Sequence, residues 1–283
     1  MPELPEVQTV VSQLDKKISG KRIASVWSDW QKKIYPSFKA FSEEVQGARV
    51  KGVRRLGKHV VIDLDNGRSI VAHLKMTGHF LIKTKKNRKQ LAFTEDRMNG
   101  YIHHILAFAD GTTAEFSDMR KFGWLRALPT DVVEALPSIA SLGIDALSPA
   151  LTAEKFRALF EKRGHRLIAP LLLEQHIVSG IGNIYRSEGL FLAGILPDRL
   201  TDSLSRAEWQ KLYASLRRVL RQAVKLRGTS DGDFRDTDGL AGTFQKTLHV
   251  YRREGLPCKK CGTILKRKKM GQRSVYFCPV CQK

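Results

Sequence analysis

The chain has 283 residues, 42% of them hydrophobic, and carries 49 lysines and arginines against 28 aspartates and glutamates. The net charge of +21 indicates a polyanionic partner, and the length favours more than one domain. An anionic membrane surface is the rival partner. The sequence contains no long uncharged apolar run and no signal-peptide pattern, which excludes a membrane-spanning class and predicts a cytoplasmic location.

The N-terminus, which begins with Met1 and Pro2, permits two interpretations. If Met1 is removed, Pro2 becomes a secondary amine, and an α-amino group, whose pKa of about 7.7–8.0 lies far below that of lysine, has a neutral, nucleophilic fraction near pH 7. Such an amine forms a Schiff base, and a secondary amine gives an iminium that stays charged. Glu3 and Glu6 are then candidate proton donors. In the other interpretation Pro2 and Pro5 only stiffen a disordered terminus.

The first half of the chain predicts one helix and a set of short strands. Residues 6–18 carry apolar side chains at helical spacing. Short β-rich runs follow between turn dipeptides at 23–27, 50–53, 59–64, 69–73, 79–82, 102–108 and 113–116. About seven short strands indicate a sandwich or a barrel. The polar, basic stretch 83–100 predicts a flexible loop.

After Pro129 the pattern becomes helical. Capping residues and periodicity predict helices at 153–162 after Thr152, at 167–176, at 183–192 after the cap Asn183, and from the Ser205–Glu208 capping box to about Leu226. The stretch 227–243 is rich in glycine, aspartate, serine and threonine, and predicts a mobile loop.

All four cysteines lie near the C-terminus, as Cys258-x₂-Cys261 and Cys278-x₂-Cys281. Two such pairs can direct four thiolates at one tetrahedral centre, so we predict one structural Zn²⁺ as the cofactor. The tail 251–283 contains ten lysines and arginines, and the stretch between the pairs is long enough for a hairpin. This pattern predicts a basic finger that contacts phosphates; the alternative is a solvated charged surface around a folding element.

Other positions are candidates for contact with nucleic acid. Gly180 and Gly182 precede the helix expected at Asn183, and helix N-termini bind phosphates; an ordinary tight turn is the alternative. Met76 and Phe122 lie among turn glycines and cations, where an apolar side chain can enter a base stack; the alternative is that they fill the core.

These motifs together resemble the formamidopyrimidine-DNA glycosylase family of base-excision repair enzymes. The resemblance rests on the N-terminal proline block, on Gly180-Ile-Gly-Asn-Ile-Tyr185 and on Gly271-Gln-Arg-Ser-Val-Tyr-Phe-Cys278, and it covers essentially the whole chain. The related endonuclease VIII branch usually has glycine at the position of Leu4, so Leu4 favours the formamidopyrimidine branch.

The resemblance implies an α+β multidomain fold with DNA in a cleft. The expected parts are an N-terminal catalytic β-sandwich with flanking helices (1–128), a helix–two-turn–helix domain (129–228), a mobile lesion-capping loop and connector (229–248) and a zinc-finger β-hairpin (249–283). The implied partner is damaged double-stranded DNA bound by a monomer, without a small-molecule cofactor.

The resemblance also assigns roles by motif position. Pro2 is expected to be the Schiff-base nucleophile, Glu3 the acid at the sugar, and Lys58 the lysine that assists β-elimination. Arg273 is expected to contact phosphate and to take part in δ-elimination. The expected DNA-binding residues are Met76, Tyr101, Arg120, Phe122, Arg163 and Asn183, of which Met76, Arg120 and Phe122 fill the gap left by the flipped nucleotide.

The chain departs from the family pattern in three places. Ala169 stands where a lysine is common, and we expect the nearby Arg163, His165 and Arg166 to replace its charge. Tyr101 begins a stretch that often reads His-x-His, and Asp231-Gly232 stands in the loop expected to cover the flipped base. These departures affect the choice of damaged base, not the proline chemistry.

The leading hypothesis is therefore an oxidised-purine glycosylase with β,δ-elimination, and three alternatives remain open. They are an endonuclease VIII-like enzyme for oxidised pyrimidines, a non-catalytic DNA-binding homologue, and a zinc-ribbon protein that binds RNA or the ribosome. The presence of Pro2, Glu3 and Lys58 argues against the non-catalytic homologue, and a zinc-ribbon protein would not need the proline block.

Overall fold

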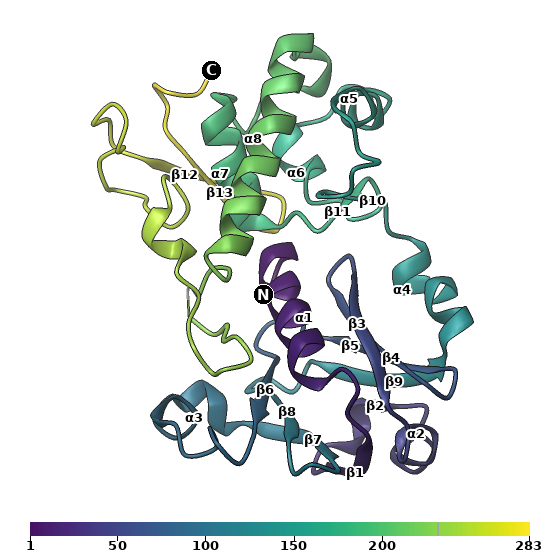
Figure 1. Ribbon diagram of the computed structural model, residues 1–283. Coiled ribbons are helices and arrows are strands. Elements are labelled where there is room, and N and C mark those ends of the chain that lie inside the picture. Colours follow the sequence, from purple (N-terminus) through teal and green to yellow (C-terminus); the bar gives the residue numbers. More distant parts are fainter. Residues whose placement is uncertain (231) are drawn as a thin grey trace. The chain divides into compact units, whose positions relative to one another are not determined.

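The computed structural model describes residues 1–230 and 232–283 (Figure 1). The described residues form two compact units, one of Met1–Ala140 with Leu226–Gln245 and one of Ser141–Lys225 with Lys246–Lys283. None of the helices in this part of the chain has both the length and the apolar character that a membrane span requires. The division into four domains at 128, 228 and 248 stays a prediction.

The first unit is built on two β-sheets, as the sandwich prediction requires (Figure 1). One sheet has the order β1-β7-β8-β6, with bounds Ile23–Ser28, Ile102–Phe108, Thr113–Ser117 and His79–Lys83. The other has the order β2-β9-β5-β4-β3, with bounds Ile34–Tyr35, Trp124–Pro129, Arg68–His73, His59–Leu64 and Val50–Leu56. Neighbouring strands are antiparallel except β2 and β9, which are parallel. The sequence prediction missed β2 and β9.

Alternation along the central strands places the core. Val60 and Ile62 of β4 belong to the main apolar cluster, together with residues of both sheets and of the first helix. Val61, on the opposite face of β4, packs in a second cluster with Val133 and Ile139. Successive strand side chains point to opposite faces, so a strand covered on both sides reads as a continuous apolar run.

Helix α1 (Leu4–Ile18) covers the main cluster with its apolar stripe, which includes Val7, Val10 and Leu14. It begins two residues before the predicted start because Glu3 and Glu6 form a capping box around its first turn. The other helices of the unit are α2 (Phe38–Val45), α3 (Leu91–Glu95) and α4 (Pro137–Ala140), with 3₁₀ turns at Gln31–Lys33, Arg97–Gly100 and Thr130–Ala135.

The prediction of a loop throughout 83–100 is wrong. This stretch contains α3 and a 3₁₀ turn, and buried Asn99 bonds to His79 Nε2 at 2.9 Å and to the Gly239 carbonyl at 3.0 Å. Asp96 forms an ion pair with Arg235. The partners from Leu226–Gln245 lie about 140 residues away in sequence, so local composition could not reveal them.

The stretch 227–243, predicted to be a mobile loop, belongs to the segment Leu226–Gln245, which packs against α1. The Thr229 N–H donates to Glu6 Oε1 at 2.7 Å, the Thr237 N–H donates to Gln13 Oε1 at 2.9 Å, and Lys17 pairs with Asp238 at 2.6 Å. Of the expected Asp231-Gly232 pair, Asp231 lies outside the described residues.

The second unit is mainly helical, with α5 (Ala153–Glu161), α6 (Ile168–Leu171), α7 (Asn183–Ala193) and α8 (Arg206–Lys225). The Thr152 cap and the Ser205–Glu208 capping box are confirmed by their hydrogen bonds. The predicted helix 167–176 ends at Leu171 because the chain turns into strand β11 (Val178–Ser179), which pairs with β10 (Ile144–Asp145).

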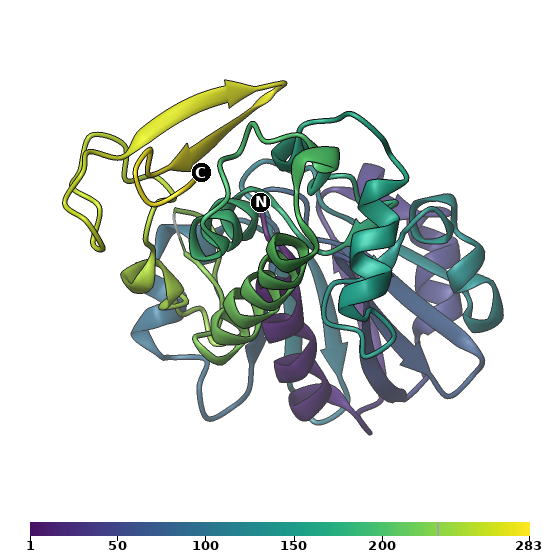
Figure 2. The same cartoon turned by 90° about the horizontal axis from the view of Figure 1, so that it is seen from above.

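The second unit ends in an antiparallel hairpin of β12 (Lys266–Met270) and β13 (Arg273–Phe277), drawn as the yellow arrows in Figure 2. Phe191 of α7 and Leu265 pack with Cys258 and Cys278 in one small cluster. The hairpin expected between the cysteine pairs is therefore present, and its core is shared with α7.

Candidate functional site

The N-terminal end of α1 brings Pro2, Glu3 and Glu6 together, and all three side chains are buried. Glu6 is not a spare proton donor. Its Oε2 accepts the Glu3 N–H at 2.8 Å, and its Oε1 accepts the Thr229 N–H at 2.7 Å. Glu6 therefore fixes the first turn and the adjoining segment. Glu3, whose side chain accepts the Glu6 N–H, is the carboxylate next to Pro2.

Lys58 lies in the two-residue turn between β3 and β4, where Leu56 pairs with His59. Gly57 adopts a φ of +57° that closes this turn. Arg55 donates to the Gly57 carbonyl at 2.9 Å and to Gln8 Oε1 at 2.9 Å. Arg55 thus ties the turn that carries Lys58 to helix α1, which Glu3 caps.

Two histidines that the sequence analysis missed lie beside Lys58. The ring centroids of His59 and His73 are 4.7 Å apart, and Trp124 lies 5.8 Å and 6.1 Å from them. Burial lowers the pKa of His59 to about 4 and that of His73 to about 3, and the charge of Lys75 adds to both shifts. Both imidazoles are therefore neutral near pH 7. His59 begins the predicted strand 59–64 and His73 ends the predicted strand 69–73, so their pairing could have been expected if the two strands form a hairpin.

The three residues expected to enter the DNA lie together on two loops. Met76 belongs to the loop between β5 and β6, and Arg120 and Phe122 to the loop between β8 and β9. An Arg120 guanidinium nitrogen lies 2.9 Å from Met76 Sδ, and the guanidinium lies 4.7 Å from the centre of the Phe122 ring. Met76 is 36% and Phe122 45% exposed, so neither fills the core. We call the loops 74–78 and 118–123 the wedge loops.

The carboxylate of buried Asp118 joins the wedge loops. It accepts the hydroxyl of Thr77, the Arg120 N–H at 3.2 Å and the Gly123 N–H at 2.7 Å. Tyr101, half-buried, accepts the Asp118 N–H on its backbone carbonyl at 2.8 Å. The structure therefore places Tyr101 beside this junction.

Close packing against Phe116 explains a glycine at the end of each wedge loop. A Cβ on Gly78 would lie 2.8 Å from the Phe116 ring, and one on Gly123 would lie 2.5 Å from it. The residue before each exposed side chain is also constrained: Lys75 has a φ of +52° and Lys121 a φ of +56°. The left-handed region costs about 1–2 kcal/mol for such residues. The wedge loops are thus held in a conformation that local preference opposes.

In the second unit, Asn183 is the first residue of α7, and Gly182 is the N-cap. The prediction that Asn183 itself caps the helix is wrong. Its side-chain oxygen instead accepts a hydrogen bond from Arg186, which is fully buried. Arg186 also donates to the carbonyl of Ser274 in β13 at 3.1 Å and to that of Ala169 at 3.1 Å. The sequence analysis missed this arginine, although its position one turn after Asn183 was a signal.

Arg186 thereby links Asn183 to the hairpin residue next to Arg273. Arg273 is exposed at the start of β13, opposite Met270. Within the second unit the structure therefore connects two of the expected phosphate ligands through one buried guanidinium.

Arg163 follows the C-terminal end of α5, and its Nε is buried without a hydrogen-bond partner among the described residues. The neighbouring cations have acidic partners: Arg166 pairs with Glu174, and His165 Nδ1 lies 2.8 Å from Asp202. Of the three cations expected to replace the missing lysine at position 169, only Arg163 lacks such a partner among the described residues.

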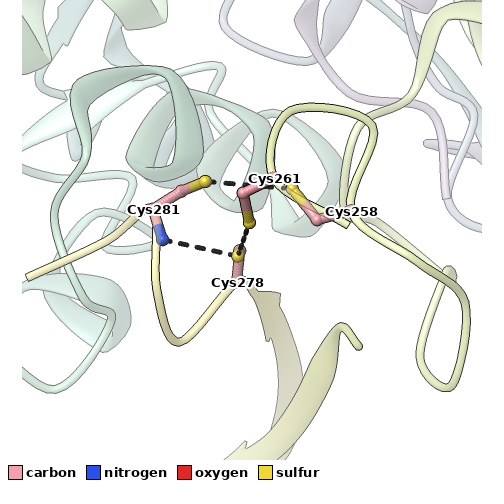
Figure 3. A group of neighbouring side chains, drawn as sticks. All are labelled: Cys258, Cys261, Cys278 and Cys281. Carbon is pink, nitrogen blue, oxygen red and sulfur yellow. Dashed lines mark hydrogen bonds between the residues drawn. The ribbon is translucent and has the colours of Figure 1, made fainter. Parts of the chain in front are cut away.

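The four cysteines converge on one point (Figure 3). All four Sγ atoms lie within 4.8 Å of one another, with Cys258–Cys281 at 3.9 Å and Cys261–Cys278 at 3.5 Å. Sulfur atoms about 2.3 Å from a tetrahedral Zn²⁺ are expected at about 3.8 Å from each other, so the donor set fits that ion. The cysteines would hold one structural Zn²⁺, which joins the two turns of the finger.

Comparison with known proteins agrees along the whole chain. The formamidopyrimidine-DNA glycosylase N-terminal domain matches residues 1–125, its H2TH domain matches 142–234, and the zinc finger found in FPG and IleRS matches 255–283. Formamidopyrimidine-DNA glycosylase from Pelotomaculum thermopropionicum is 38% identical over 100% of this chain and 99% of its own length. The Enterococcus faecalis protein of the same name is 36% identical over 100% and 97%.

Solved structures give the same result. The complex of Lactococcus lactis Fpg with abasic-site DNA has a TM-score of 0.86 at 31% identity and covers 99% of both chains. The complex of the same protein with Fapy-dG DNA has a TM-score of 0.85 at 31% identity and covers 99% of this chain and 100% of its own. With three successive domain matches and full-length relatives above 30% identity, the chain belongs to the formamidopyrimidine-DNA glycosylase family.

Proposed function

We propose that this protein is a base-excision repair glycosylase that removes oxidised purines, formamidopyrimidines and 8-oxoguanine, and cleaves the strand at the resulting abasic site. The observation that carries the proposal is the N-terminus of α1, where Pro2 and Glu3 are tied through Gln8 and Arg55 to the turn of Lys58. The relatives named as formamidopyrimidine-DNA glycosylases and the L. lactis complexes with abasic and Fapy-dG DNA support the same reaction.

The chemistry begins with removal of Met1, which is half exposed. The Pro2 nitrogen attacks C1′ of the damaged nucleotide, and the bond from C1′ to the base breaks. The neutral form of the Pro2 amine is the nucleophile. Glu3 delivers the proton that the sugar needs as the ring opens.

The iminium then drives strand cleavage. It acidifies the C2′ proton, whose loss expels the 3′-phosphate by β-elimination, and a second elimination expels the 5′-phosphate. Water hydrolyses the final Schiff base and restores the amine. Lys58 assists the first elimination and Arg273 the second, each as a cation beside a departing phosphate.

The other site residues position the DNA. Met76, Arg120 and Phe122 fill the gap left when the lesion leaves the stack, and their mutual contacts on the wedge loops support that role. Tyr101 lies beside those loops. Asn183 and Arg163 contact phosphates in the second unit, where Arg186 holds the Asn183 oxygen and leaves its amide nitrogen to donate.

Nothing in the site favours the alternative functions, and Pro2, Glu3 and Lys58 argue against a binding protein without activity. The protein is expected to act as a monomer, without a small-molecule cofactor. The relatives are bacterial, so the proposed place of action is the bacterial nucleoid in the cytoplasm.

Borohydride reduction on duplex DNA with an abasic site tests the nucleophile. Protein that mass spectrometry shows to lack Met1 should form a covalent adduct, and Pro2→Gly should lose most of it. Pro5→Ala is the matched control, because Pro5 lies only three residues further along, in the first turn of α1, but cannot form the iminium. An absence of adduct with the processed wild-type protein would refute the enzyme function.

A second assay tests the substrate class. Duplexes that carry 8-oxoguanine, a formamidopyrimidine or an oxidised pyrimidine are compared under single-turnover conditions. We expect faster excision of the purine lesions. A faster release of the pyrimidine lesion would transfer the assignment to the endonuclease VIII-like alternative.

A further inference from the structure

Trp30 contacts a wedge loop from a distant part of the first unit. The Lys121 ammonium nitrogen lies 4.5 Å from the centre of the Trp30 ring, and that of Lys32 lies 5.7 Å from it. An ammonium group over an indole face is attracted by the negative charge of the ring face. The closer of the two contacts involves the residue between Arg120 and Phe122.

Trp30 has a fixed position because its neighbours are bonded to the end of β7. The Trp30 N–H donates to Ser28 Oγ at 3.1 Å, and that hydroxyl lies 2.8 Å from His104 Nδ1. Asp29 pairs with His103 Nδ1 at 2.9 Å. The indole Nε1 is buried without a hydrogen-bond partner among the described residues. The backbone of Trp30 is therefore anchored, and its ring contacts the ammonium groups of Lys121 and Lys32.

Lys121 is the residue at which this contact matters. Its φ of +56° turns the chain between Arg120 and Phe122, and its N–H donates to the Asp118 carbonyl at 3.1 Å. A lysine disfavours this conformation, so an attractive contact of its side chain helps to stabilise it. Attraction to Trp30 is of comparable size to the cost of the left-handed backbone.

We propose that Trp30 is a positioning residue for the insertion of Phe122 into DNA. The indole holds the Lys121 ammonium, the bound ammonium stabilises the left-handed Lys121 backbone, and that backbone fixes the exposed Phe122 ring before DNA arrives. This inference rests on the proposed function. It adds a residue that does not touch the reacting atoms but lowers the cost of filling the gap beside a flipped base.

The proposal separates insertion from chemistry. A lesion in a duplex must leave the stack, and Phe122 assists that step. An abasic site in single-stranded DNA has no base to extrude, so the reaction of Pro2 with it depends little on Phe122. Loss of Trp30 should therefore slow excision from a duplex and leave adduct formation on the single strand unchanged.

The test compares Trp30→Leu, Trp30→Phe and the control Trp27→Leu, which removes an exposed tryptophan three residues away. Three quantities are measured: single-turnover excision from an 8-oxoguanine duplex, fluorescence of 2-aminopurine next to the lesion, and borohydride adduct on single-stranded abasic DNA. We expect Trp30→Leu to lower the first about tenfold and to reduce the second, while the third stays constant. Trp30→Phe, which keeps an aromatic face, should recover most of the loss.

A double variant checks the route of the effect. Lys121→Gly removes both the ammonium and the preference against a positive φ, so on that background Trp30→Leu should have little further effect. Full additivity, or equal losses for Trp27→Leu and Trp30→Leu, would overturn the proposal. A loss of the single-strand adduct in Trp30→Leu, with the adduct still present in the wild-type protein, would also overturn the proposal. If the wild-type protein itself formed no adduct, the proposed function would be refuted.

Discussion

The two compact units hold their functional side chains by different means. In the first unit, Met76 and Phe122 each lie on a wedge loop, directly after a lysine that has a left-handed backbone conformation. Buried Asp118 fixes both loops. In the second unit, Asn183 and Arg273 lie at the ends of regular elements. The first unit therefore depends on the position of a few groups, and the second on the charge that it presents to phosphates.

This difference teaches which measurement reports on which unit. A change in the first unit should appear in rates on a damaged duplex, because insertion and proline chemistry need exact placement of few atoms. A change in the second unit should appear in affinity and in its salt dependence, because each phosphate contact releases counterions. The following predictions test that division.

Removal of the metal should have the largest effect. Structural zinc contributes about 10–16 kcal/mol to the folding of isolated finger peptides, and the finger here has a small core besides its cysteines. Chelation or Cys278→Ser should abolish tight duplex binding, measured by fluorescence anisotropy. Added Zn²⁺ should restore the chelated wild-type protein but not Cys278→Ser. Unchanged binding after verified metal loss would remove the finger from the DNA contacts.

Disruption of Asp118 should have the next largest effect and should stay within the first unit. Asp118→Ala leaves the Thr77 hydroxyl and the N–H groups of Arg120 and Gly123 without their acceptor. The expected loss is about 2–4 kcal/mol in the free energy of unfolding, measured by urea denaturation. Asp110→Ala is the control, because its ion pair with Lys21 is exposed. Equal losses in both variants would contradict the role of the wedge-loop junction.

Acid should destabilise the first unit through His59 and His73. Their folded-state pKa values, about 4 and about 3, lie below the ordinary 6.5. Below pH 6.5 the unfolded chain therefore binds protons that the folded chain does not. The free energy of unfolding consequently decreases as the pH is lowered from about 6.5 to about 3. At about 1.4 kcal/mol per pKa unit, the two histidines contribute several kcal/mol to this pH-dependent part of the free energy of unfolding.

The measurement is urea denaturation between pH 7.5 and 5. The double variant with His59→Phe and His73→Phe should lose part of the pH dependence, and exposed His176→Phe should keep all of it. Parallel curves for the double variant and the wild-type protein would show that these imidazoles are not the responsible groups.

Removal of one finger charge should have the smallest effect. Arg273→Ala should weaken binding to many DNA sequences alike and reduce the slope of log affinity against log salt by about 1. Arg267→Ala is the control on the same hairpin, because Arg267 pairs with Glu254 at 2.8 Å. An unchanged slope for Arg273→Ala would exclude it from the phosphate contacts.

The sequence by itself determined the features that depend on near neighbours. The cysteine spacing predicted the metal cluster, the apolar period predicted α1, and the β-rich runs at 50–53 and 59–64 placed Lys58 between two strands. The motifs also identified the family. These features could be predicted because a short stretch of chain carries the whole signal.

Tertiary structure alone decided the features that depend on distant partners. Glu6 serves as an anchor rather than a donor because Thr229 reaches it from 223 residues away. Asn99 is buried because Gly239 lies beside it, and Lys121 is placed over Trp30 although 90 residues separate them in the sequence. Local propensity and periodicity describe what a segment can form, whereas these contacts depend on which segments the packed core brings together.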